Sequence, residues 1–216
     1  MSDAATPATF GAECPPSECG KIALDQLQEA LGVAVLPSGF RALSGSDNGI
    51  NDVYMNLKRQ LTEDKLSYRV KLLAIIAGAS AVGSRPAVEY FARVARAQEI
   101  PADEILEAVA VASTCTTFNT YYRFRNQITE EDNEAFKAFR APFNSNVFVK
   151  ATLPKLTVEA ICIAVSSING CHECTQSHMA KAKELGVTNE QIDELMQAVS
   201  GAMGAALAAA VLDGLV

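Results

Sequence analysis

The chain of 216 residues contains no tryptophan, and aromatic residues make up only 6% of it. It also lacks a run of arginine and lysine. Its formal charge of -7 and its pI near 4.9 oppose binding to a polyanion, so we expect no nucleic-acid partner. Strand signals are scarce, whereas alanine is abundant, which favours helices packed through small side chains.

Neither a secretory signal nor a membrane span is apparent in the sequence. Residues 1–7 lack the basic region and the apolar core of a signal peptide. The most apolar stretch, Ala198 to Leu212, is short for a membrane span and rich in alanine and glycine, and Asp213 closes it. The sequence therefore predicts a cytoplasmic protein without membrane contact, in which this stretch is a buried helix suited to a subunit interface.

The chain has only two histidines, and both lie beside two of its six cysteines, in Cys171-His172-Glu173-Cys174-Thr175-Gln176-Ser177-His178. In a helix over residues 171–185, Cys171, Cys174 and His178 are spaced i, i+3 and i+7 and share one face. Asn169-Gly170 breaks the preceding apolar run, so we expect Cys171 in the first turn of this helix. The unpaired N–H groups there favour negative charge and lower the pKa of a thiol. The pattern indicates thiol redox chemistry.

Glu159 lies twelve residues before Cys171, within the apolar run of residues 158–165. A carboxylate in such a run is costly unless it has a partner, and the motif is the partner we expect. His178, one turn beyond Cys174, can take the proton of the thiol. Glu159 can then orient that imidazole, or receive the proton directly or through a water molecule. A proton relay is the leading hypothesis.

Other interpretations of these residues remain open. A zinc ion held by Cys171, Cys174, His178 and Glu159 is one, although structural zinc sites usually draw their ligands from two separate segments. Cysteines that are buried by coincidence are another, because free cysteine is among the most buried residue types. A c-type haem is excluded in its usual form, since Thr175 stands where histidine would follow the second cysteine.

The remaining four cysteines show no such pattern. Cys115 and Cys162 lie on apolar helical patterns and are predicted to be packing residues. Cys14 and Cys19 lie in a turn-rich segment that we expect to be mobile, where an inert tail is the simplest interpretation and thiol exchange stays open. Six cysteines without a secretory signal argue against a disulfide scaffold and for reduced thiols with a local function.

The chain aligns with itself after a shift of 87 residues, which matches residues 73–112 with 160–199 without a gap. In the earlier copy the places of Cys171, Cys174, His178 and Glu159 are taken by Ser84, Ala87, Phe91 and Leu72. All four reactive groups are replaced together, so packing does not require them. The sequence predicts a duplicated helical unit, with a degenerate repeat at about 64–125 and an active repeat at about 154–214.

Helix patterns and breakers give a coarse layout. We expect helices over 22–31, 51–60, 64–81, 85–98, 102–120, 129–138 and 171–185. Glycines and prolines indicate a loop over 36–49. Thr129 is predicted to cap one helix, Thr157 to open the second unit, and Thr188-Asn189-Glu190-Gln191 to form a capping box for the last helix.

The spacing of Glu159, Cys171, Cys174 and His178 resembles that in alkyl hydroperoxidase D (AhpD) proteins of the carboxymuconolactone decarboxylase superfamily. The segment from Asn119 to Arg125 resembles the same family. The likeness covers roughly residues 50–213, with residues 1–20 as a flexible extension and residues 21–216 as one domain. It implies an all-α, AhpD-like helical bundle of two related repeats, the second carrying the motif.

The resemblance also implies an activity and partners. Members of the family are homotrimers that reduce hydroperoxides, or that pass electrons from dihydrolipoamide-bearing proteins to a partner peroxiredoxin. We therefore expect no bound cofactor or metal, and an external dithiol such as dihydrolipoamide as the reductant. By position, the resemblance implies that Cys174 attacks the peroxide and Cys171 resolves it. His178 is then the base, and Glu159 is the end of a relay through Cys171 and a water molecule.

One position departs from the family pattern, which often has histidine immediately before the second cysteine. This chain has Glu173 there, and a carboxylate near the sulfur of Cys174 would raise the pKa of that thiol. His172 lies one position earlier and is at most a secondary proton relay, because its direction differs from that of Cys171 by about 100° on a helix.

Two other functions on the same scaffold stay open. One is a redox adaptor or sensor, whose disulfide serves a protein partner without significant peroxide turnover. The other is a carboxymuconolactone decarboxylase-like enzyme that processes a lactone, for which the thiol pair would be unnecessary.

Overall fold

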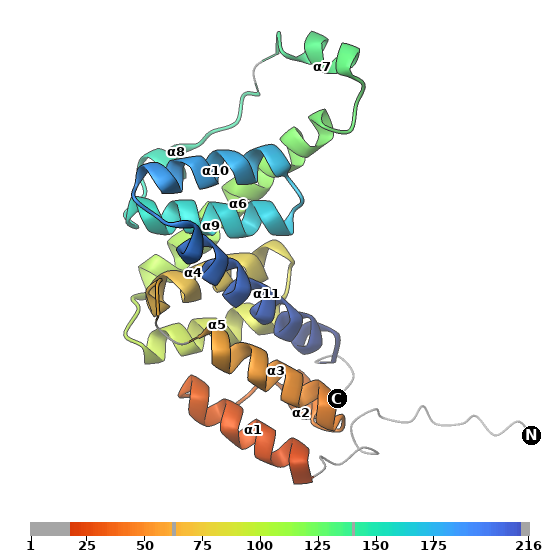
Figure 1. Ribbon diagram of the computed structural model, residues 1–216, viewed down its shortest axis with the longest axis vertical. Helices are drawn as coiled ribbons and strands as arrows, with labels where there is room; N and C mark the ends of the chain where they lie inside the picture. Colours follow the sequence, from red (N-terminus) through yellow and green to blue (C-terminus); the bar gives the residue numbers. More distant parts are fainter. Residues whose placement is uncertain (1–17, 62–63, 140, 213–216) are drawn as a thin grey trace, which may run out of the picture.

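The computed structural model describes residues 18–61, 64–139 and 141–212, and the secondary-structure elements within them are helices. The all-α class predicted from the sequence is confirmed. Figure 1 shows the helices in order: α1 (Glu18–Leu31), α2 (Ser38–Leu43), α3 (Asp47–Gln60), α4 (Tyr68–Ala81), α5 (Arg85–Ala97), α6 (Ala102–Arg125), α7 (Glu130–Phe136), α8 (Asn146–Val149), α9 (Lys155–Ile168), α10 (His172–Glu184) and α11 (Asn189–Leu212).

Helices α4 and α9 pack against each other in the middle of the molecule. Every residue of α4 from Val70 to Ala79 is buried, as is nearly all of α9 from Thr157 to Ser166. A helix that is apolar on almost all sides belongs in the core of a soluble protein. Helix α6 packs on both of them, α5 and α11 pack on α4, and α10 packs on α9. In Figure 1, α1–α3 form one end of the molecule and α7 the other.

The helix boundaries repeat along the chain. Helices α4, α5 and α6 begin and end 87 residues before α9, α10 and α11, respectively. Gly83 and Gly170 follow the first helix of each set, with positive φ angles of 72° and 68°. Glycine adopts this left-handed conformation without the strain that a Cβ causes. The two related helical repeats predicted from the sequence are therefore present in the fold.

Local capping residues form the contacts that the sequence predicts. The N–H of Gln191 donates to Oγ1 of Thr188 (3.3 Å), and the N–H of Thr188 donates to Oε1 of Gln191 (2.9 Å), which makes a capping box at the start of α11. Oγ1 of Thr129 accepts from the N–H of Asp132 (3.1 Å) at the start of α7.

Helix α11 has one face in the core and one outside it. A stripe of small residues, Ala198, Ala202, Ala205 and Ala209, is buried against α2, α3 and α4, whereas Leu207 is 66% exposed. The prediction of a buried helix therefore holds for one face only. By length and composition alone α11 could cross a membrane, a criterion that many core helices also meet.

The predicted loop over residues 36–49 is wrong in part, because Ser38–Leu43 form α2. Phe40 is buried in the core, which fixes the helix in place. Gly39 allows α2 to approach α11 closely, since a Cβ at Gly39 would lie 2.8 Å from Cα of Ala209. Tertiary packing thus outweighs the breaker residues that suggested a loop.

Several other boundaries differ from the prediction. Helix α4 begins at Tyr68 rather than at residue 64, because Ser67 caps it by accepting from the N–H of Val70 (3.4 Å). Helix α1 begins at Glu18 rather than at residue 22, and Cys19 lies in its first turn, inside the predicted extension of residues 1–20. Cys14 lies outside the described residues. Helix α6 continues beyond residue 120 to residue 125, and α8 was not predicted.

Candidate active site

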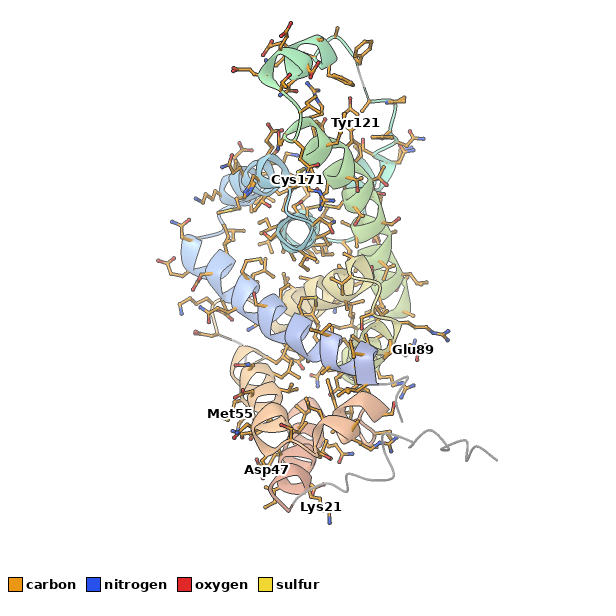
Figure 2. All side chains as sticks on the ribbon, turned by 90° about the vertical axis from the view of Figure 1, so that its right-hand side faces the viewer. Lys21, Asp47, Met55, Glu89, Tyr121 and Cys171 are labelled. Carbon is orange, nitrogen blue, oxygen red and sulfur yellow. A yellow bond between two sulfur atoms is a disulfide. The ribbon has the colours of Figure 1, made fainter. Side chains whose placement is uncertain are left out.

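The junction between α9 and α10 places the two cysteines of the motif. Gly170 turns the chain, and the N–H of Cys171 donates to the carbonyl oxygen of Ser166 (3.0 Å) across that turn. Cys171 is the N-cap residue of α10, one position before the first turn where the sequence predicted it. Cys171 and Cys174 form a disulfide, with their Cα atoms 5.3 Å apart. Figure 2 shows Cys171 beside α10, away from the end of the molecule that carries Lys21 and Asp47.

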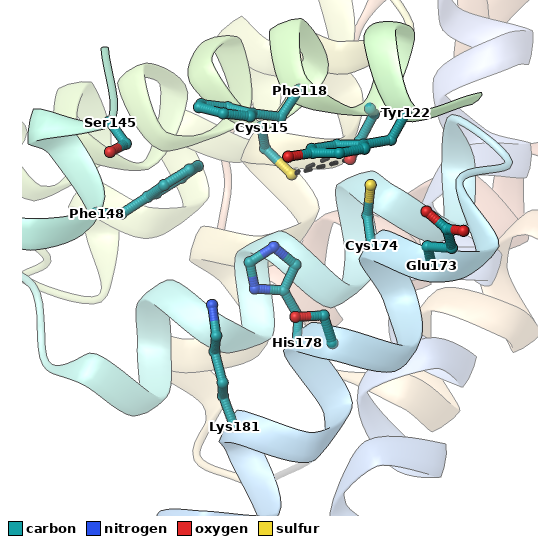
Figure 3. Close-up of a pocket in the computed structure, with 11 residues that line it drawn as sticks. Cys115, Phe118, Tyr122, Ser145, Phe148, Glu173, Cys174, His178 and Lys181 are labelled. Atoms are coloured by element: carbon teal, nitrogen blue, oxygen red, sulfur yellow. Dashed lines mark hydrogen bonds between the residues drawn. The ribbon is translucent and has the colours of Figure 1, made fainter. Parts of the chain in front are cut away.

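Cys174 lines a cavity of about 400 Å³ between α6 and α10. Phe118, Tyr122 and Phe148 form an aromatic wall, in which the ring of Phe118 stacks on that of Tyr122 at 6.4 Å and lies 5.9 Å from that of Phe148. Cys174 is 8% exposed, whereas Cys171 is 1% exposed and does not line the cavity. Of the two sulfur atoms, the one in Cys174 is therefore the one that a small molecule can reach (Figure 3).

His178 shares this cavity and is held by Glu159. Nδ1 of His178 lies 2.7 Å from Oε2 of Glu159, and the two side chains are only 14% and 17% exposed. The prediction that the carboxylate of the apolar run finds its partner in the motif is confirmed. Because Nδ1 is engaged by the carboxylate, Nε2 is the ring nitrogen left for chemistry in the cavity. The ring of Phe148 lies edge-on to the imidazole, 6.3 Å away.

Comparison with known proteins identifies the family. Residues 134–213 match the model of the carboxymuconolactone decarboxylase family. The chain is 31% identical over 161 residues to the alkyl hydroperoxide reductase AhpD of Maricaulis maris, which covers 73% of this chain and 90% of that protein. It is 30% identical over 158 residues to the alkyl hydroperoxide reductase AhpD of Methylocella silvestris. That alignment covers 73% of this chain and 86% of the Methylocella protein. The chain belongs to the AhpD family.

The zinc interpretation of the AhpD-type motif does not fit this structure. A zinc ion on Cys171, Cys174, His178 and Glu159 would need both sulfurs as thiolates. Here the two sulfurs are bonded to each other, so neither is a thiolate. The arrangement is that of an oxidised dithiol beside a base.

Of the two residues between the cysteines, Glu173 lines the cavity and His172 does not. Glu173 lines the cavity next to Cys174 and is exposed, so the family's usual histidine is replaced by a carboxylate at the rim of the site (Figure 3). His172 is exposed and is not among the residues that line the cavity. Its exposure fits a surface residue, and its role as a secondary proton relay stays a prediction. Arg123 donates to the carbonyl oxygen of Asn169 (2.8 Å) and so supports the end of α9 rather than the cavity.

Two cysteines that the sequence assigned to packing lie at the site. Cys115 and Cys162 are buried as predicted, but Cys115 also lines the cavity and has polar neighbours. Its Sγ lies 3.4 Å from Oγ of Ser166 and accepts a hydrogen bond from Nδ2 of Asn119 (3.5 Å). The spacing held a signal for this placement: Cys162 follows Glu159 by three residues, and Asn119 follows Cys115 by four, so each pair shares a helix face.

The contact between the Cys115 and Cys162 thiols shifts their pKa values in opposite directions. Hydrogen bonding from the Cys162 thiol lowers the pKa of Cys115 to about 7, although burial acts in the opposite direction. Ser166, His178 and Asn119 also favour the Cys115 thiolate. The same contact, together with burial, raises the pKa of Cys162.

Proposed function

We propose that this protein is a thiol peroxidase that reduces hydroperoxides through Cys171 and Cys174. The observation that carries the proposal is that Cys174 and His178 line one cavity while Glu159 holds the imidazole at 2.7 Å. A thiol, a base and a group that orients the base are the set that produces a nucleophilic thiolate near neutral pH. The names of the AhpD relatives, which are alkyl hydroperoxide reductases, support the same reaction.

In the reduced protein, His178 takes the proton of the Cys174 thiol, and Glu159 stabilises the imidazolium that results. The thiolate attacks the terminal peroxide oxygen and the O–O bond breaks. The leaving alkoxide takes the proton from His178 and departs as an alcohol, while Cys174 becomes a sulfenic acid. The Cys171 thiol then attacks this sulfur, water leaves, and the disulfide forms. An external dithiol supplies two electrons and two protons to restore both thiols, and is itself oxidised to a disulfide.

The lining of the cavity favours an organic hydroperoxide with an apolar group. Three aromatic side chains, Phe118, Tyr122 and Phe148, face the space beside Cys174, and burying apolar surface there contributes to binding. The volume of about 400 Å³ accommodates a small organic molecule. We therefore propose alkyl hydroperoxides as the substrate class.

The reductant and the partners form a further part of the proposal. Resemblance to the AhpD family supports a dihydrolipoyl group as the dithiol and a peroxiredoxin as an electron acceptor. It also supports a homotrimer, and the exposed Leu207 on α11 offers apolar surface for such an assembly. A cytoplasmic location fits a dithiol that must be reduced for each turnover.

The test is to treat the reduced protein with one equivalent of cumene hydroperoxide. We expect two thiols to disappear, with a Cys171–Cys174 linkage in peptide mass mapping. Cys174→Ser should abolish turnover, whereas Cys171→Ser should stop at a sulfenic acid that dimedone traps. Undiminished turnover by Cys174→Ser would exclude the proposed nucleophile.

Two further assays, of steady-state peroxide turnover and of lactone turnover, separate the other two functions. A redox adaptor would show the disulfide but no steady-state turnover of peroxide with a dithiol alone, and would need a protein acceptor. A decarboxylase or lactone-processing enzyme would keep its activity on a lactone in the Cys171→Ala/Cys174→Ala variant.

A further inference from the structure

Three side chains of the types that bind metal ions, from three different helices, meet at the wall of the cavity. They are Cys115 of α6, Cys162 of α9 and His178 of α10, and their sulfur and nitrogen atoms all lie within 4.8 Å of one another. We propose that these three residues bind a zinc ion. The site is distinct from the motif thiols, since Cys171 and Cys174 contribute nothing to it.

The donor set matches the chemistry of zinc. Two thiolates and one imidazole are typical zinc ligands, with Zn–S near 2.3 Å and Zn–N near 2.0 Å, so tetrahedral ligands stand up to about 3.8 Å apart. The observed limit of 4.8 Å therefore requires the ligand atoms to approach one another by at most about 1 Å around the ion. The three ligands come from packed helices, which limits how far each can move from this geometry.

Glu159 supplies the outer contact that zinc-bound histidines usually have. It accepts from Nδ1 of His178 at 2.7 Å, which fixes the ring and leaves Nε2 to face a metal ion. A carboxylate on the far nitrogen orients the imidazole and raises its basicity, and such outer partners are worth about 10- to 100-fold in metal affinity. This pair is thus suited to metal binding as well as to proton transfer.

Access and burial also fit a bound ion. Cys115 is 1% exposed and Cys162 0%, so the thiolates would be shielded from water once the ion neutralises them. Cys115 and His178 line the cavity, which provides an entry path for the ion and for a fourth ligand such as water (Figure 3). Lys181 lines the same cavity, but it is exposed and its flexible ammonium group can turn to solvent.

A zinc ion bound to Nε2 of His178 would prevent this nitrogen from taking the proton of the Cys174 thiol. Zinc binding and thiolate formation at Cys174 would then exclude each other, a consequence that rests on the proposed function. Zinc binding itself does not rest on the proposed function, because Cys171 and Cys174 are not among the zinc ligands.

The test uses the full chain with Cys14→Ser and Cys19→Ser and with the Cys171–Cys174 disulfide formed. In this protein only Cys115 and Cys162 remain as thiols. Titration with Co²⁺ should give thiolate-to-metal charge-transfer absorption that saturates at one equivalent, and Zn²⁺ should displace the cobalt. Cys162→Ser and Cys115→Ser should each lose this absorption, and Glu159→Gln should weaken binding about tenfold or more.

A second measurement distinguishes loss of zinc binding from misfolding of the variants. Zinc should raise the thermal unfolding midpoint of the Cys14→Ser/Cys19→Ser protein, because an ion that binds only the folded state stabilises it. It should do the same when Cys171 and Cys174 are also changed to serine. Absence of charge transfer in the starting protein would overturn the proposal, as would full retention of cobalt binding by a folded Cys115→Ser/Cys162→Ser variant.

Discussion

Glu107 and Glu194 occupy equivalent positions in the two repeats, and each accepts hydrogen bonds from the backbone that leads into the first helix of the other repeat. Glu107 accepts from the N–H of Thr152 (2.6 Å), and Glu194 accepts from the N–H of Lys65 (2.8 Å). Thr152 and Lys65 are themselves 87 residues apart. The two contacts are reciprocal, so each repeat fixes the start of the other one's buried helix.

Glu194 has a second role, because its Oε1 lies 2.5 Å from Nζ of Lys71, whose side chain is fully buried. Glu194→Gln removes the negative charge beside a buried ammonium group. We expect it to lower the free energy of unfolding by about 3 kcal/mol, as when one partner of a buried ion pair is removed. Glu107→Gln is the matched control, with a smaller expected loss of about 1 kcal/mol. Urea denaturation measures both.

The effect of Glu194→Gln should depend on pH. Burial by itself would raise the pKa of Glu194, but hydrogen bonds from Lys71 and from the N–H of Lys65 outweigh it and lower the pKa below 4.5. The stabilisation is therefore fully present above the pKa of the unfolded chain, and it is lost as pH falls through the lower pKa of the folded protein. The stability gap between Glu194→Gln and the parent should narrow in acid. An equal gap at neutral and acidic pH would contradict this account.

The sequence predicts the features of this fold that depend on local chemistry. The shift of 87 residues located both repeats, and the capping residues Thr129 and Thr188 form the contacts expected of them. The caps depend on residues three positions apart, and the repeat is a similarity within the sequence itself, so the sequence shows both directly. The pairing of Glu159 with His178 could also be predicted, because a carboxylate in an apolar run requires a partner.

Other features that depend on tertiary packing were not predicted. Helix α2 forms because Phe40 is buried and Gly39 meets α11, and neither contact is visible in the local pattern. Cys115 and Cys162 are 47 residues apart, and only the packing of α6 on α9 brings them to the cavity. An apolar helical pattern shows that a cysteine is buried, but it does not show which polar groups it meets.

Replacing the carboxylate that holds the proposed base should slow peroxide reduction. Gln in place of Glu159 can still bond to His178, but it cannot stabilise the imidazolium. Glu159→Gln should therefore reduce kcat/KM for an organic hydroperoxide about 10- to 100-fold. The Cys171–Cys174 disulfide should still form when excess peroxide is given time. The measurement is the pH dependence of kcat/KM.

Glu184→Gln serves as the control for this prediction, because Glu184 is an exposed acid at the far end of α10. It should leave the rate and the pH profile unchanged. A Glu159→Gln profile that coincides with that of the parent would argue against a relay through His178.

The carboxylate of Glu173, at the rim of the cavity, should disfavour the thiolate form of Cys174. Glu173 lies next to Cys174 and lines the same cavity, so its negative charge opposes that of a thiolate there. Glu173→Gln should lower the pKa of the reduced Cys174 thiol and speed its reaction with iodoacetamide severalfold at neutral pH. Glu184→Gln, which also removes one carboxylate from α10, is again the control. Equal alkylation rates for the two variants would contradict an electrostatic role for Glu173.

Two glycines offer a test of how the backbone positions the disulfide. Gly170 and Gly83 both have positive φ, and a Cβ added at either would have no neighbour within 4 Å, so Ala at each position costs only backbone strain. We expect Gly170→Ala and Gly83→Ala each to lower the free energy of unfolding by about 1 kcal/mol.

Only Gly170→Ala should also change the thiol chemistry. The turn at Gly170 sets the hydrogen bond from the N–H of Cys171 to Ser166, whereas Gly83 precedes Ser84, which has no sulfur. Gly170→Ala should shift the reduction potential of the Cys171–Cys174 pair, measured by equilibration with glutathione, while Gly83→Ala should match the parent. Because both substitutions impose the same strain, a shift common to both would mean that overall stability, rather than this turn, controls the disulfide.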